Sequence, residues 1–170
     1  KLNTVAQILY AGVVLAALAG VWLWGRLGGG SRPLMFGMLQ AGRLGTFFTL
    51  IVCAATAATA MLSADYLREH DTETGEYYGL LLLSAAGMVM LIMAADLATV
   101  FLGVETMSLG VYVLTASRRR SPRSAEGAMK YFLTGAFATG VLLYGIALVY
   151  GAAGTTNLDA IAELVRRNPS

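Results

Sequence analysis

Apolar residues form five long runs along the 170-residue chain, separated by shorter stretches rich in glycine and charged residues. A helix needs about twenty apolar residues to cross a bilayer, because the hydrocarbon core is ~30 Å thick and the helix rises ~1.5 Å per residue. The pattern therefore predicts an all-α, polytopic transmembrane helix bundle that occupies residues 1–170 as one region. The predicted spans are residues 5–24, 44–62, 78–95, 97–116 and 124–151, the last with its apolar run over 129–151.

Asp96 alone separates the third and fourth spans. A single helix over residues 80–116 would be roughly 55 Å long, well beyond a bilayer, so the chain must turn at Asp96. Aspartate suits the start of a helix because its side chain accepts hydrogen bonds from the free backbone N–H groups there. We therefore expect a structural role for Asp96, with a place at the mouth of a transport path as the alternative.

The segments between the other spans are polar or rich in glycine. Residues 25–42 contain three consecutive glycines and a proline before a short apolar patch, which predicts a flexible loop with an interfacial segment. Residues 65–76 carry aspartate, glutamate, threonine and glycine and are predicted to be a solvated loop. His70 lies within this loop without metal-ligand spacing around it, so we expect an exposed histidine.

The end of the chain predicts a further, shorter helix over residues 158–167. Its apolar residues recur at i, i+3, i+4 and i+7 and share one face, which is typical of a helix that lies along the membrane surface. Thr156 or Asn157 would cap this helix at its start.

Composition and charge agree with a membrane protein. Hydrophobic residues make up 57% of the chain and charged residues only 13%, with a net charge of +2. This balance gives no case for nucleic-acid binding, which needs a basic face. The Lys and Arg totals of the two membrane sides are nearly equal, so orientation is assigned by the densest cluster, which places its side in the cytoplasm. That cluster consists of Arg118, Arg119, Arg120 and Arg123.

Cysteine and motif content limit the chemistry that this chain can perform. Cys53 is the single cysteine, so the sequence offers neither a disulfide framework nor a thiolate metal site. Phosphate loops, dinucleotide-binding turns and ligand sets for haem or iron–sulfur clusters are also missing from the sequence. We therefore expect no metal or cofactor in this chain, and any redox chemistry in another subunit.

Glu105 lies near the middle of the fourth span, which carries no other charge. A carboxylate at the centre of a bilayer costs roughly 2.5–3.5 kcal/mol on insertion scales, so it needs polar or water-filled surroundings. Ion or proton transport is the first hypothesis, because a carboxyl subject to opposing effects of burial and polar neighbours can exchange protons. The alternative is a buried carboxyl that serves only the packing or orientation of the helices.

Lys130 lies in the fifth span, roughly 9 Å inside the helix if that helix starts at Ser124. Its side chain could extend to the headgroups. Alternatively, Glu126 one turn earlier could pair with it and hold it inside the bundle. If the two helices run antiparallel side by side, Glu105 and Lys130 differ in depth by roughly 7 Å, which favours a water-linked step over a direct ion pair. We predict that the two form a proton relay.

The sequence around Glu105 and Lys130 resembles that of a known family. The stretch Asp96-Leu-Ala-Thr-Val-Phe-Leu-Gly-Val-Glu105, its continuation to residue 114, and residues 123–137 and 143–158 resemble the subunit N family of the proton-pumping NADH–quinone oxidoreductases, respiratory complex I. The match is specific over residues 66–158 and weak before residue 44. The resemblance implies an antiporter-like subunit of the membrane arm, built from inverted repeats, in which Glu105 and Lys130 belong to the proton pathway.

The resemblance also implies a setting for the chain. NADH, FMN, iron–sulfur clusters and quinone would be bound by other subunits, and the partners would be further membrane-arm subunits, antiporter-like ones included, in a bacterial inner membrane. The later-helix lysines of the family are absent, which predicts a fragment of a fourteen-helix protein. An Mrp-type cation/proton antiporter subunit predicts the same glutamate and a similar lysine, and a structural membrane scaffold without transport is the second alternative.

Overall fold

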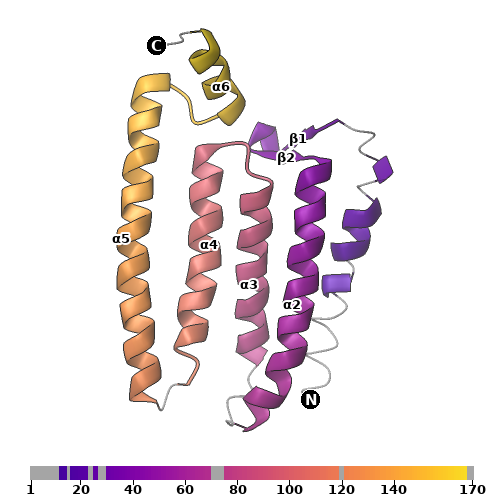
Figure 1. Cartoon of the computed structure of the whole chain (residues 1–170), viewed down its shortest axis with the longest axis vertical. Coiled ribbons are helices and arrows are strands. Elements are labelled where there is room, and N and C mark those ends of the chain that lie inside the picture. The colour runs from indigo at the N-terminus through magenta and orange to yellow at the C-terminus, as the bar shows by residue number, and fades with distance from the viewer. Residues whose placement is uncertain are drawn as a thin grey trace.

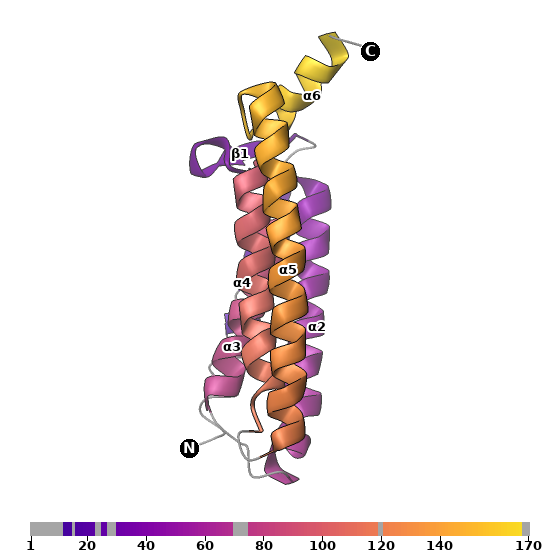
Figure 2. The same ribbon diagram turned by 90° about the vertical axis from the view of Figure 1, so that its left-hand side faces the viewer.

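Four long helices stand side by side in a row and a short one lies beyond their ends, as the computed structural model shows (Figure 1). The structure describes residues 12–14, 16–22, 25–26, 30–69, 75–118 and 121–167. In chain order each long helix packs against the next, and the row is narrow when seen from its side (Figure 2). The helices are α2 (Arg43–Glu69), α3 (Gly75–Ile92), α4 (Leu97–Thr115), α5 (Pro122–Ala153) and α6 (Leu158–Arg167).

The four long helices are each apolar enough over a sufficient length to cross a membrane. They overlap the last four predicted spans, and the described residues 12–14 and 16–22 of the first span are helical as well. The start of that first span, residues 5–11, lies outside the described residues, as does His70. The α5 helix begins before residue 124, because Ser121 caps it and Pro122 suits the first turn, where no N–H is needed.

The structure differs from the prediction in two segments that were expected to be loops, residues 25–42 and 65–76. Within residues 25–42 the chain forms an antiparallel hairpin of β1 (Arg32–Leu34) and β2 (Leu39–Ala41), joined by the 3-10 turn η1 (Met35–Gly37). The hairpin has a partner, because the chain between α3 and α4 is extended and exchanges backbone hydrogen bonds with residues 38–40. Within residues 65–76, α2 continues to Glu69 and α3 already begins at Gly75, so only residues 70–74 separate the two helices.

Asp96 joins two segments at the end of the bundle that carries the hairpin. One carboxylate oxygen accepts the backbone N–H of Ala98 at 2.8 Å, which confirms the predicted cap. The other accepts the hydroxyl of Thr156 at 2.6 Å. Asn157, rather than Thr156, caps α6 by accepting the N–H of Ala160 at 3.0 Å. The start of α4 and the connection after α5 are therefore tied together.

The α3 and α4 helices touch through glycines. A Cβ atom added at Gly87 would lie 2.4 Å from the backbone nitrogen of Met107, and one added at Gly103 would lie 2.9 Å from that of Leu91. At Gly110 the added atom would lie 2.9 Å from the carbonyl oxygen of Leu80. Since side chains cannot enter these contacts, the two backbones approach closely and the rotation of α4 about its axis is fixed.

Substitution of Gly87 tests this packing. We expect Gly87→Ala to destabilise the full-length protein by about 1–3 kcal/mol, because the added methyl group meets backbone rather than a flexible side chain. Gly79→Ala in the same helix is the matched control, since nothing lies within 4 Å of its added Cβ, and alanine favours helix by up to ~1 kcal/mol. Denaturant-dependent unfolding in detergent measures both. Equal stability of the two variants would contradict the contact.

A double-mutant cycle tests the junction at Asp96. Asp96→Ala should cost about 0.5–2 kcal/mol through loss of the cap. In combination with Thr156→Val, the two effects should be non-additive by about 0.5–1.5 kcal/mol, because both substitutions break the same hydrogen bond. Asp159→Ala, an exposed aspartate in the first turn of α6, is the control. Strictly additive losses would show that the Thr156 contact contributes nothing.

Candidate functional site

Glu105 lies on the side of α4 that faces α5. The opposite side of α4 is fixed against α3 by Gly103 and Gly110, whereas Tyr112 contacts residues of α5. Successive residues are rotated by ~100° about a helix axis, so Tyr112 lies ~160° from Gly110 and only ~20° from Glu105. The glutamate is half-buried, and within the described ranges its carboxylate has neither a hydrogen bond nor an ion pair.

The height of Glu105 in the bundle follows from the hydrogen bond that joins the ends of α4 and α5. The hydroxyl of Ser124 donates to the carbonyl oxygen of Thr115 at 2.6 Å, so these two residues are level. Glu105 precedes Thr115 by about ten residues, or ~15 Å, and Lys130 follows Ser124 by about six, or ~9 Å. The two titratable residues therefore differ in height by ~6 Å, close to the expected value.

The structure does not bring Lys130 to Glu105. Tyr131, Phe132 and Gly135 of α5 contact Tyr112 of α4, and Lys130 lies ~100°, ~160° and ~140° away from them around the helix. Its ammonium nitrogen pairs with Glu126 at 2.5 Å on a face where the lysine side chain is 74% exposed. The ion pair between Lys130 and Glu126 is confirmed, but in the described part of the chain it lies on the outer face of α5 and does not hold Lys130 inside the bundle.

Tyr112 is the residue that sequence reasoning missed. It is buried, and its ring meets those of Tyr131 and Phe132 edge to face, with centroids 5.0 Å and 5.6 Å away. A Cβ added at Gly135 would lie only 1.8 Å from the Tyr112 hydroxyl oxygen, so this glycine leaves a notch that the hydroxyl occupies. The spacing of seven residues from Glu105 was the available signal, because it places both on one helix face.

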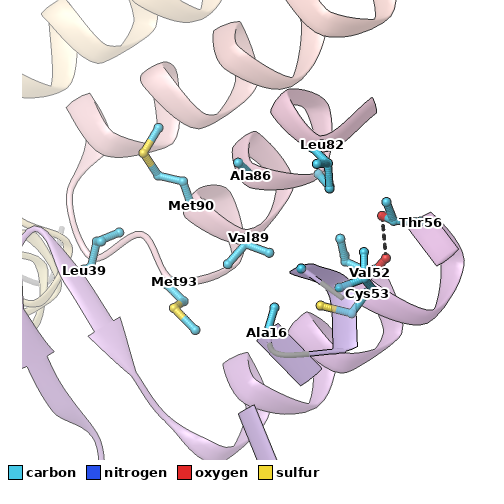
Figure 3. A pocket seen from close by; sticks show the side chains of 13 residues that line it. Ala16, Leu39, Val52, Cys53, Thr56, Leu82, Ala86, Val89, Met90 and Met93 are labelled. Atoms are coloured by element: carbon cyan, nitrogen blue, oxygen red, sulfur yellow. Dashed lines mark hydrogen bonds between the residues drawn. The ribbon is translucent and has the colours of Figure 1, made fainter. Parts of the chain in front are cut away.

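A second feature, an apolar cavity of about 400 Å³, lies between α2, α3 and the helical residues before the hairpin (Figure 3). Val52, Cys53, Val89 and Met93 are among its lining residues, and its one hydroxyl, that of Thr56, is bonded to the carbonyl oxygen of Val52 at 2.8 Å. Among the described lining residues the thiol of Cys53 is the remaining polar group, and it has no charged or polar residue of the lining beside it that could form an acid–base pair. Among the described residues no cluster of histidine, cysteine, aspartate and glutamate could hold a metal ion.

The chain is similar in sequence to proteins of a known family. Residues 94–170, which contain Glu105, Lys130 and Tyr112, match the family described as NADH:quinone oxidoreductase/Mrp antiporter, TM. Subunit N 1 of the NADH-quinone oxidoreductase of Sorangium cellulosum is 45% identical over 160 residues, and subunit N of Salinibacter ruber is 42% identical over 160 residues. These matches cover 91% and 94% of this chain. Residues 94–170 belong to the NADH:quinone oxidoreductase/Mrp antiporter family.

Two solved structures contain a chain with a similar fold. Respiratory complex I from Thermus thermophilus with bound aureothin contains a chain with a TM-score of 0.77 and 30% identity, matched over 92% of this chain and 33% of that one. The membrane-bound sulfane sulfur reductase, an archaeal respiratory membrane complex, gives a TM-score of 0.77 at 25% identity, over 94% of this chain and 34% of that one. The fold is an antiporter-like membrane helix bundle, as predicted.

The relatives also define what the chain covers. It spans 32% of the length of the two subunit N relatives, and the resemblance to subunit N that the sequence indicated is confirmed. With bacterial relatives and four helices able to span a membrane, the chain is a multi-pass inner-membrane protein.

Proposed function

We propose that this chain is part of a proton-translocating membrane-arm subunit of an NADH–quinone oxidoreductase, with Glu105 and Lys130 in its proton relay. The position of Glu105 is the observation that supports this function most strongly. Glu105 lies mid-helix, ~15 Å from the end of α4, half-buried at the α4–α5 contact and without a partner in the described residues. An unpaired carboxyl at that depth is costly to maintain for packing alone, and such groups mark proton or ion paths.

Glu105 would act as the proton-loading carboxyl. In a low-dielectric bundle the protonation of a carboxyl responds strongly to a charge that moves nearby, because little solvent screens the two. Lys130 supplies such a charge one helix away and ~6 Å different in height. Since Lys130 faces away from α4, the coupling would pass through water at the α4–α5 contact rather than through a direct ion pair.

The path would continue on the outer face of α5. Lys130 lies there with Glu126, which can release the ammonium group when the lysine exchanges a proton or turns to a new partner. The exposed side chains along the same helix are largely apolar, which fits a surface against further helices or lipid. The partners would then be other membrane-arm subunits, and the NADH, FMN, iron–sulfur and quinone chemistry that drives pumping would take place in them.

A cation/proton antiporter subunit is the second candidate, because the matching family includes Mrp antiporters. Such a subunit would carry the same carboxyl but exchange protons for sodium. Proton movement in proteoliposomes that requires sodium on the opposite side, with no coupling to NADH oxidation, would favour it over the first proposal.

The proposal is tested by substitution in the whole, reconstituted complex. Glu105→Gln and Lys130→Met each keep the approximate size of the side chain and remove its titration. We expect NADH-driven proton pumping to fall by about tenfold or more in each, as is usual when a proton-transferring group is lost. Glu163→Gln is the control, because Glu163 is an exposed carboxylate of α6 paired with Arg167 outside the spans.

Pumping rate and proton-to-electron ratio should both be measured. A scaffold role for Glu105 predicts that a correctly assembled Glu105→Gln complex pumps like the parent. That outcome in both variants would exclude the relay.

A further inference from the structure

Tyr112 and Glu105 lie on the same face of α4, seven residues or ~10.5 Å apart along the helix. Gly135, whose notch holds the hydroxyl, follows Ser124 by about eleven residues, or ~16 Å, and Glu105 precedes Thr115 by ~15 Å. Helical side chains lean towards the N-terminal end of their helix, so the phenol of Tyr112 extends in the direction of Glu105. The hydroxyl therefore covers part of the distance to Glu105 on the α5 side of α4, and water would have to bridge the rest.

Neither group has another partner. In the described part of the chain, the Tyr112 hydroxyl and the Glu105 carboxylate make no hydrogen bond. Tyr112 is only 8% exposed, but its hydroxyl is not among the fully buried polar atoms that lack a partner, so water can reach it. On α5, Glu126 and Lys130 are charged, and they form an ion pair with each other. On α3 the one charged residue is Glu76, which lies in the first turn of that helix.

We propose that Tyr112 is a positioning residue of the relay, whose hydroxyl is linked to the Glu105 carboxyl through water. The inference rests on the proposed function of Glu105. The hydroxyl holds the carboxyl on the α5 side, where the proton must leave α4. The ring is fixed by Tyr131 and Phe132, the two residues that follow Lys130, so a movement of α5 at Lys130 shifts the hydroxyl as well.

The notch at Gly135 explains why the position is narrowly defined. With the added Cβ 1.8 Å from the hydroxyl oxygen and 2.7 Å from Cζ, any larger residue at 135 must displace the phenol. Gly135→Ala should therefore act like loss of the hydroxyl. Tyr112→Phe removes the hydroxyl alone and keeps the ring contacts, so it separates the hydrogen bond from the packing.

The test uses the whole complex and two measurements. Tyr112→Phe is expected to slow NADH-driven proton pumping about two- to tenfold, the range for one hydrogen bond, while Glu105→Gln slows it more. Infrared spectroscopy first identifies the carboxyl band that Glu105→Gln removes. This band should shift in Tyr112→Phe and in Gly135→Ala, because the hydrogen bond to the carboxyl changes. Tyr144→Phe, which removes a hydroxyl from an exposed tyrosine of α5, should leave rate and band as in the parent.

The outcomes separate the two proposals. If Glu105→Gln slows pumping but Tyr112→Phe pumps at the parental rate with an unmoved band, the role of Tyr112 is overturned and the relay stands. If Glu105→Gln pumps normally, the role of Glu105 in the relay fails, and the role of Tyr112 fails with it whether or not the band moves. A slowed Tyr112→Phe with a shifted band supports both.

Discussion

The close glycine contact between α3 and α4 is the constraint on which the site depends. Because Gly87, Gly103 and Gly110 allow the two backbones to touch, α4 can adopt only one rotation about its axis. That rotation turns Glu105 and Tyr112 together towards α5. A bundle with side chains at this contact would hold α4 further away and would leave the direction of its carboxyl undefined. The small residues of α3 and α4 thus serve function through geometry rather than chemistry.

A second constraint acts at the end of the bundle that carries the hairpin. The backbone between α3 and α4 pairs with residues 38–40 on one side and residues 156–158 on the other, and Asp96 adds a side-chain bond to Thr156. These contacts fix the start of α4 relative to the end of α5. The opposite ends are joined by the bond from Ser124 to Thr115. With both ends held, the approximate heights of Glu105 and Lys130 follow from helix rise.

Local sequence pattern was sufficient for the last four spans, the place of Glu105 in the middle of its helix, the cap at Asp96 and the helix Leu158–Arg167, since each depends on residues close in sequence. It did not predict the hairpin, because the strands are short and their partner is the extended chain between α3 and α4. Nor could it give the bond from Asp96 to Thr156, which spans 60 residues. The direction in which Lys130 points depends on which face of α5 packs on α4, and Tyr112 became visible only once that face was known.

If Glu105 exchanges protons at the α4–α5 contact, water must reach its carboxyl. An experimental structure of the whole complex, at a resolution that shows ordered water, would reveal this directly. We expect water within hydrogen-bonding distance of the Glu105 carboxyl, on the side of Tyr112 and Gly135, and continuing towards Lys130. A dry contact, with the carboxyl enclosed by apolar side chains and bonded only to helix backbone, would contradict it.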